Sequence, residues 1–177
     1  PPPRTMTRAP VKTSSTGIAS TASSGTIYRC LARNCTNNGL DLNPGGGNLA
    51  ILCEVTGCST AVAAQGGSFI ACTAHDNTIS GFQGNNGGGF ALGCISCNNT
   101  GASSNGFRYI GTTNVSRYIN CVAYGNGAHG FFINATSSTQ VHQAINCLAV
   151  NNGGYGFSAT SAVDYFYLHN CAGFNKT

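Results

Sequence analysis

The sequence predicts an all-β protein folded as a parallel β-helix (solenoid) of about six to seven coils, preceded by an extended N-terminal tail. Two observations carry this prediction. Seven cysteines recur at intervals of 19 to 27 residues, and each lies in a similar apolar phrase. The composition is also unusual, because 25 of the 177 residues are Gly, 20 are Asn and only 7% are charged. So few charges argue against a helical bundle, whose solvent-facing sides are filled with Glu, Lys and Arg.

Equivalent residues of successive repeats fall into three rows. The first row is the set of cysteines Cys30, Cys53, Cys72, Cys94, Cys121, Cys147 and Cys171. Five residues later comes a row typical of corners, with Cys35, Cys58, Asn77, Asn99, Asn126 and Asn152. A large apolar residue then recurs at Leu40, Val62, Phe82, Phe107, Phe131 and Phe157. Asn tolerates a left-handed backbone and bonds its own backbone, so we expect the Asn positions to form sharp turns.

The phrases around the cysteines alternate in polarity. In Ile119–Ala123 and Ile145–Ala149, every second residue is apolar. This period of two predicts that each phrase is a short strand with one buried face. Helical repeats require a period of 3.6, and leucine-rich repeats require several Leu in each unit. Stacked coils about 4.8 Å apart account for all the rows together.

Two phrases carry a family resemblance, namely Asn120–Asn126 with Gly130-Phe131 and Asn146–Asn152 with Gly156-Phe157. They resemble the right-handed β-helices of the pectate-lyase superfamily, which include family-nine pectate lyases and phage tailspike and capsid-surface proteins. The resemblance covers about residues 25 to 177. It implies a right-handed single-stranded parallel β-helix and leaves the function open, because this superfamily includes lyases, hydrolases, adhesins and inert rods.

Family-nine pectate lyases use a Lys base and an Asp-rich calcium site, and the chain departs from both features. Its lysines, Lys12 and Lys176, lie outside the body coils. An Arg base stays open, with the candidates Arg29, Arg33, Arg108 and Arg117. The four acids lie at different offsets from the preceding Cys, so we expect no stacked calcium-binding carboxylates; they are Asp41, Glu54, Asp76 and Asp164.

Glu54 and Asp76 are the one pair of acids from adjacent coils that could flank a sugar bond, as glycoside hydrolysis requires. Their offsets differ by three residues, which predicts that they face apart. The neighbouring His75 is expected to be a corner residue rather than a partner of Asp76, because adjacent strand residues alternate faces. We therefore predict no catalytic residue.

No metal or cofactor is predicted. The histidines do not share an offset; they are His75, His129, His142 and His169. A zinc site needs convergent pairs of Cys or His, and Cys94–Cys97 is a single such spacing. Stacked cysteines about 4.8 Å apart fit poorly to disulfide geometry, so the seven-member row is expected to be a buried ladder of reduced thiols. A disulfide bridge between Cys35 and Cys58 is an alternative that the sequence does not decide.

Ligand binding is expected on outward-facing aromatic side chains, because Tyr can stack on sugar rings. The candidates are Tyr109, Tyr118, Tyr124 and Tyr155, with Tyr165 and Tyr167 as further outer rings. The alternative is that these rings simply cover a β-sheet surface. The sequence contains no dense basic patch of the kind that binds nucleic acids, and it contains no apolar run long enough to span a membrane.

The two ends differ from the body. Residues 1–16 hold four of the five prolines and the basic residues Arg4, Arg8 and Lys12, which predicts an extended tail that could contact a neighbouring subunit. Residues 17–177 form the predicted β-helix. A further coil opens at Cys171, so we expect either more chain beyond residue 177 or a partner that covers the open strand edge.

Two functional hypotheses follow. The first is a non-enzymatic structural or adhesive β-helix on a virion or extracellular surface, as a decoration, fibre or spike component with glycan binding as an additional role. It predicts a homo-oligomer or larger assembly formed through the tail and the coil ends. The alternative is a polysaccharide lyase or glycoside hydrolase that acts on an acidic polysaccharide. The scarcity of charged residues favours the first hypothesis.

Overall fold

The computed structural model describes residues 5–7, 16–20, 24–42, 47–58, 64–84, 89–111, 115–135, 140–160 and 165–174. Within these ranges the chain forms 22 short β-strands and no α-helix. The same residues therefore hold no helix that is long and apolar enough to cross a membrane.

The strands form three parallel sheets, named A, B and C. Sheet A contains β1 (Thr5–Thr7), β3 (Thr26–Tyr28), β6 (Leu49–Ile51), β9 (Ser68–Ile70), β12 (Gly89–Leu92), β15 (Ser116–Ile119), β18 (Val141–Ile145) and β21 (Tyr165–His169). Sheet B contains β4 (Leu31–Arg33), β7 (Glu54–Thr56), β10 (Thr73–His75), β13 (Ile95–Cys97), β16 (Val122–Tyr124), β19 (Leu148–Val150) and β22 (Ala172–Phe174). Sheet C contains β2 (Ile18–Ala19), β5 (Leu40–Asp41), β8 (Ala64–Gln65), β11 (Phe82–Gly84), β14 (Phe107–Gly111), β17 (Phe131–Ala135) and β20 (Phe157–Ala159).

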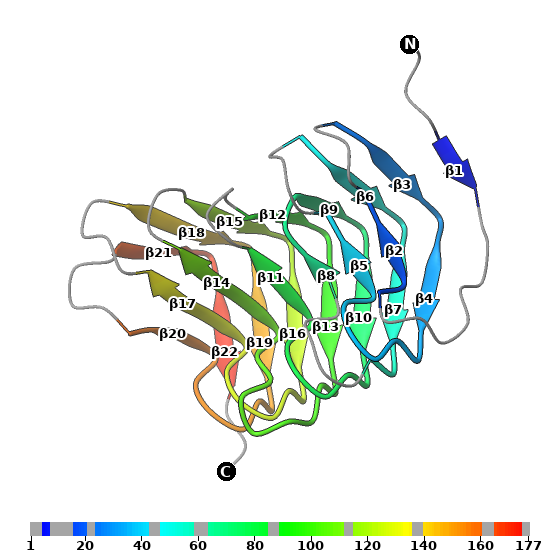
Figure 1. Cartoon of the computed structure of the whole chain (residues 1–177). Coiled ribbons are helices and arrows are strands. Elements are labelled where there is room, and N and C mark those ends of the chain that lie inside the picture. Colours follow the sequence, from blue (N-terminus) through cyan, green and yellow to red (C-terminus); the bar gives the residue numbers. More distant parts are fainter. Residues whose placement is uncertain are drawn as a thin grey trace.

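Each strand pairs in parallel with its equivalent one coil away, so the chain winds through sheets A, B and C in turn (Figure 1). Ser96, for example, is in register with Ala74 of the coil before and Ala123 of the coil after. This parallel β-helix confirms the predicted fold class. The count of coils was slightly too high, since the solenoid has about 5 turns rather than six to seven. Strands at both ends of the stack belong to coils that the described residues do not complete.

The sequence predicted one continuous strand through each row cysteine, and the structure instead has a corner between sheets A and B there. The residue before each row cysteine has a positive φ, as at Leu52 (54°) and Asn120 (53°). A left-handed residue bends the chain and shifts the alternation of side chains. Ile119 therefore points to the outer side of sheet A, while Cys121 and Ala123 are buried. The apolar phrase is a corner between two strands and not one continuous strand.

The corner between sheets B and C also differs from the expectation. The positive φ falls one residue before the Asn row, at Asn98 (53°) and Asn151 (52°). Asn77, Asn99, Asn126 and Asn152 are instead buried inside the solenoid. Each amide group donates to the next carbonyl oxygen, from Asn77 Nδ2 to Asn99 Oδ1 (2.9 Å), from Asn99 Nδ2 to Asn126 Oδ1 (2.7 Å) and from Asn126 Nδ2 to Asn152 Oδ1 (2.9 Å). The row satisfies buried polar groups along the axis.

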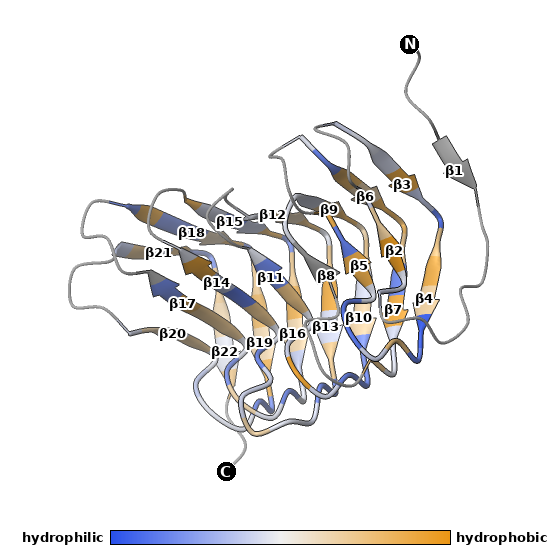
Figure 2. Cartoon of the chain, viewed as in Figure 1, coloured by the Kyte–Doolittle hydropathy of each residue, from blue (hydrophilic) through white to orange (hydrophobic). Residues whose placement is uncertain are grey.

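The interior of sheet C holds a ladder of phenyl rings. Phe82, Phe107, Phe131 and Phe157 are in register, and neighbouring rings are nearly parallel, with centroids 5.1, 4.8 and 4.9 Å apart. Parallel strands place identical side chains about 4.8 Å apart, which suits offset ring stacking. Figure 2 shows hydrophobic colour on strands of all three sheets, and hydrophilic colour on the turns between sheets B and C as well as on parts of strands such as β14, β17 and β18.

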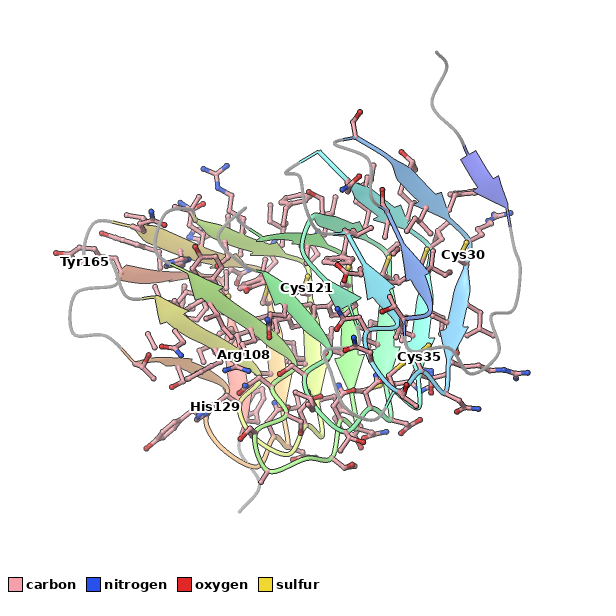
Figure 3. The ribbon with its side chains drawn as sticks, viewed as in Figure 1. Cys30, Cys35, Arg108, Cys121, His129 and Tyr165 are labelled. Carbon is pink, nitrogen blue, oxygen red and sulfur yellow. The ribbon has the colours of Figure 1, made fainter. Side chains whose placement is uncertain are left out.

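All ten cysteines are free thiols. The seven row cysteines lie at the corner between sheets A and B, as Figure 3 shows for Cys30 and Cys121, and Cys35 lies at the next corner. Their sulfur atoms contact backbone carbonyls, and Cys72 Sγ accepts a hydrogen bond from the amide of Cys53 (3.4 Å). Cys35 and Cys58 are buried neighbours without a bridge.

Only part of the predicted tail is described. Thr5–Thr7 form β1, which adds to the edge of sheet A beside β3. Arg4, Arg8 and Lys12 lie outside the described residues. The division into residues 1–16 and 17–177 stays a prediction.

Candidate functional site

Two of the four tyrosines predicted to bind a ligand lie inside the solenoid, which is a correction. Tyr109 (0% exposed) and Tyr118 (3% exposed) occupy inward positions of β14 and β15. Inward and outward positions alternate within these strands, and the left-handed corners shift that alternation between strands. Tyr124 and Tyr155 are 45% and 65% exposed, and their role in sugar binding stays a prediction.

Tyr155 belongs to a stack of three rings at the corner that leads into sheet C. Its ring is parallel to that of His129, with an interplanar angle of 1° and centroids 5.6 Å apart. The His129 ring in turn lies on Phe132, at 16° and 5.0 Å. His129 and Tyr155 occupy equivalent positions of successive coils, so the repeat itself aligns the two rings. We call Phe132, His129 and Tyr155 the ring stack.

The protonation state of His129 follows from one hydrogen bond. The backbone N–H of Tyr155 donates to Nδ1 of His129 (2.9 Å). Since an amide can only donate, Nδ1 must be the acceptor, and the ring proton lies on Nε2. Burial lowers the pKa of His129 from its ordinary value. The ring is therefore neutral at pH 7, and Nε2–H is a donor.

Arg108 lies beside the ring stack on the outer side of sheet C. It is in register with Gln83 and Phe132. Its side chain is half-buried, and Nε is buried with no hydrogen-bond partner. Burial lowers the pKa of Arg108, although a guanidinium group stays protonated in proteins. Within the described part of the chain, no carboxylate forms an ion pair with Arg108.

A second polar cluster, formed by Glu54, His75 and Asp76, lies on the outer side of sheet B and corrects two predictions. His75 Nδ1 contacts Asp76 Oδ2 (2.7 Å), and His75 Nε2 contacts Glu54 Oε1 (3.0 Å). The two acids thus converge on one imidazole instead of facing apart. Asp76 has a φ of 53°, which breaks the strand alternation and returns its side chain to the face of His75. Glu54 reaches His75 from the adjacent strand β7.

The two carboxylates of this cluster stabilise the protonated form of His75. Burial lowers the pKa of His75, but its hydrogen bonds to Asp76 and Glu54 and their negative charges outweigh burial, so the net pKa is raised above 6.5. Both carboxylates are more than half exposed. Because they bind opposite nitrogens of one ring, they do not converge on one point. Among the described residues, no group of three or more His, Cys, Asp or Glu is placed to hold a metal ion.

The remaining candidates are dispersed. Lys12, Lys176 and Asp164 lie outside the described residues. Arg29 lies over the ring of Tyr28 (5.2 Å), and Arg33 and Arg117 are exposed on sheets B and A. Sequence reasoning missed His129 and Phe132 as site residues. The available signal was the equal offset of His129 and Tyr155 from their row cysteines.

Comparison with known proteins identifies the fold. No protein-family model matches the chain, and no curated protein matches it. Among solved structures, the chain is similar to the pectate lyase Pel9A, with a TM-score of 0.59 and 17% identity over 97% of this chain and 52% of that chain. It is also similar to a double mutant of the periplasmic alginate epimerase AlgG, with a TM-score of 0.60 and 12% identity over 84% of this chain and 45% of that chain. The chain spans about half the length of both proteins. The likeness shows the parallel β-helix fold.

Proposed function

We propose that this chain is a non-enzymatic, glycan-binding β-helix displayed on a virion or extracellular surface. The ring stack carries the proposal. Tyr155 offers an exposed aromatic face, and the neutral His129 adds an Nε2–H donor beside it. Sugar rings have apolar C–H faces that pack on aromatic rings and hydroxyl groups that accept hydrogen bonds. An aromatic face with an adjacent donor suits that combination.

The similar structures support the choice of ligand class. One is named a pectate lyase and the other an alginate epimerase, and both names refer to polysaccharides. The second protein is also named as periplasmic, which agrees with a location outside the cytoplasm for proteins of this fold. Function belongs to sites and not to folds, so the ring stack has to be tested directly.

Affinity electrophoresis through gels that contain a polysaccharide provides the test. Pectin, alginate and a neutral glucan should be compared at one protein concentration. We expect the protein to be retarded in at least one gel, and the Tyr155→Ala variant to bind about tenfold more weakly, equivalent to about 1.4 kcal/mol. Retardation by none of these polysaccharides would count against glycan binding.

Tyr165→Ala is the matched control. Tyr165 is 58% exposed but lies on β21 of sheet A, away from the ring stack. It should bind as the unmodified protein does. Equal losses in the two variants would show that exposed tyrosines bind glycans without a defined site.

A polysaccharide lyase or glycoside hydrolase is the second candidate function, favoured by one observation. Glu54 and Asp76 flank His75 on an exposed sheet, so two carboxylates and an imidazole lie within reach of one ligand. Incubation with pectate and alginate, with and without calcium, tests this candidate through unsaturated products and reducing ends. Product formation that is lost in His75→Gln would support an enzyme and contradict the non-enzymatic proposal.

Assembly through residues 1–16 and the coil ends is part of the first proposal. Light scattering measures the mass in solution, and a mass above the 18.0 kDa of one chain is the expected result. A monomer at every concentration would contradict the assembly.

A further inference from the structure

We propose that Arg108 makes the ring stack selective for acidic sugars, by binding the carboxylate of a uronate residue in the polysaccharide. This inference rests on the glycan binding proposed above. It assigns a specificity-determining residue and a class of ligand, a carboxylated polysaccharide, to the same surface.

The first support is position. Arg108 on β14 and Phe132 on β17 are partners in the parallel register, and both point outward from sheet C. His129 lies on the Phe132 ring at 5.0 Å, and Tyr155 lies beyond His129 at 5.6 Å. Figure 3 shows Arg108 and His129 near one another beside this sheet. The cation and the aromatic face thus belong to one surface.

The second support is charge. Arg108 is a half-buried cation, and no carboxylate of the described residues neutralises it. Burial is the cause of its lowered pKa, with no neighbouring charge contributing. Removing a charge from water without a partner is unfavourable, and a guanidinium group matches the planar, two-oxygen geometry of a carboxylate. An anionic group of a ligand would supply the missing partner.

The third support is direction. Arg108, His129 and Tyr155 come from three successive coils, because they precede or lie in β14, β17 and β20 in turn. Successive coils are about 4.8 Å apart along the axis. A sugar chain that lies along this axis would place one residue at Tyr155 and a neighbouring carboxylate at Arg108.

Isothermal titration with matched oligosaccharides tests the selectivity. The probes are oligogalacturonate, the same oligosaccharide with its carboxylates methyl-esterified, and a sulfated oligosaccharide of similar length. We expect Arg108→Gln to weaken oligogalacturonate binding about tenfold and to leave the esterified ligand unchanged. Arg108→Lys should restore part of the loss, because it keeps the charge without the planar fork. Arg117→Gln, an exposed arginine of sheet A, is the control.

Four outcomes would overturn the inference. If Arg108→Gln weakens both ligands equally while its circular dichroism is unchanged, Arg108 does not read the carboxylate. If the unmodified protein prefers the sulfated ligand, the acidic group is sulfate rather than uronate. If the unmodified protein binds no oligosaccharide, the proposed function and this inference both fail. If it binds all the ligands and Arg108→Gln changes none of the affinities, only this inference fails.

Discussion

At the scale of single residues, two left-handed positions in each coil decide where the chain turns. One precedes the row cysteine and the other precedes the buried Cys or Asn of the next corner, as at Ala71 (φ 50°) and Asp76 (φ 53°). Each bend directs the following residue inward. The buried Asn side chains then need partners, and the neighbouring coils supply them.

The Asn row predicts a large effect of one substitution. In Asn99→Ala, both the backbone N–H and Nδ2 of Asn77 lose their acceptor, Asn99 Oδ1. An unsatisfied buried polar group costs about 1–3 kcal/mol, so we expect the free energy of unfolding to fall by about 2–4 kcal/mol. Urea denaturation measures this change. Thr100→Ala, at an exposed neighbouring position, should stay within about 0.5 kcal/mol, and equal values for the two variants would contradict the ladder.

The cluster on sheet B predicts a pH-dependent effect of His75→Gln. The pKa of His75 is higher in the folded state than its ordinary 6.5. The stability from its interactions with Glu54 and Asp76 is therefore present below about pH 6.5 and is lost as the pH rises through the folded pKa. The variant should be destabilised at about pH 5.5 and much less at about pH 8.5, by under about 1 kcal/mol because both acids are exposed.

Thermal unfolding at the two pH values measures this effect. His169→Gln, which replaces an exposed histidine, is the control. A loss of stability at high pH that equals the loss at low pH would mean that His75 acts through packing and not through its charge.

At the scale of elements, no strand is stable by itself. The strands have two to five residues, and their stability comes from pairing with the coils on either side and from the interior rows. The ladder of phenyl rings contains the largest side chains of these rows. A ring in the middle of the ladder has two stacked neighbours, while a ring at its end has one.

This difference predicts a gradient along the ladder. Phe107 is fully buried between Phe82 and Phe131, so Phe107→Ala should cost about 3–5 kcal/mol. Phe157 is half-buried, so Phe157→Ala should cost clearly less. Urea denaturation of the two variants provides the comparison. A larger loss at Phe157 would indicate that the end of the described stack is covered in solution.

At the scale of the whole molecule, the ten thiols report whether the solenoid is intact. Burial and the neighbouring Cys58 raise the pKa of Cys35 to about 11, and the hydrogen bond of Cys121 together with burial raises that of Cys94 to about 12. Only the thiolate reacts, so these groups are protected in the folded protein. Cys97 and Cys171 are the two half-buried thiols.

We therefore expect maleimide labelling of at most Cys97 and Cys171 before unfolding, and labelling of ten thiols afterwards. Intact-mass spectrometry counts the labels. Dithiothreitol should leave the melting temperature unchanged. A mass deficit of two hydrogens, together with a melting temperature that dithiothreitol lowers, would instead establish one disulfide, and peptide mapping would show whether it joins Cys35 and Cys58.

The fold was predictable from the sequence because stacking places equivalent residues in rows, and a row appears in a sequence as a period. The Cys, Asn and Phe periods are sufficient to indicate a parallel β-helix. The wrong predictions of side-chain direction share one cause. They assume that inward and outward side chains alternate along the chain without a break. The left-handed residues Asp76 and Asn120 interrupt that alternation.

The sequence alone is enough to establish the repeat, the fold class and the buried cysteine row, because each depends on neighbours at a recurring separation along the chain. Which side chains meet across rows depends on the tertiary structure. In the folded chain, Tyr109 and Tyr118 are buried, and Glu54 and Asp76 both contact His75. Arg108 lies beside the ring stack. Contacts between rows depend on the bend angle at each corner and on side-chain reach, and neither leaves a period in the sequence.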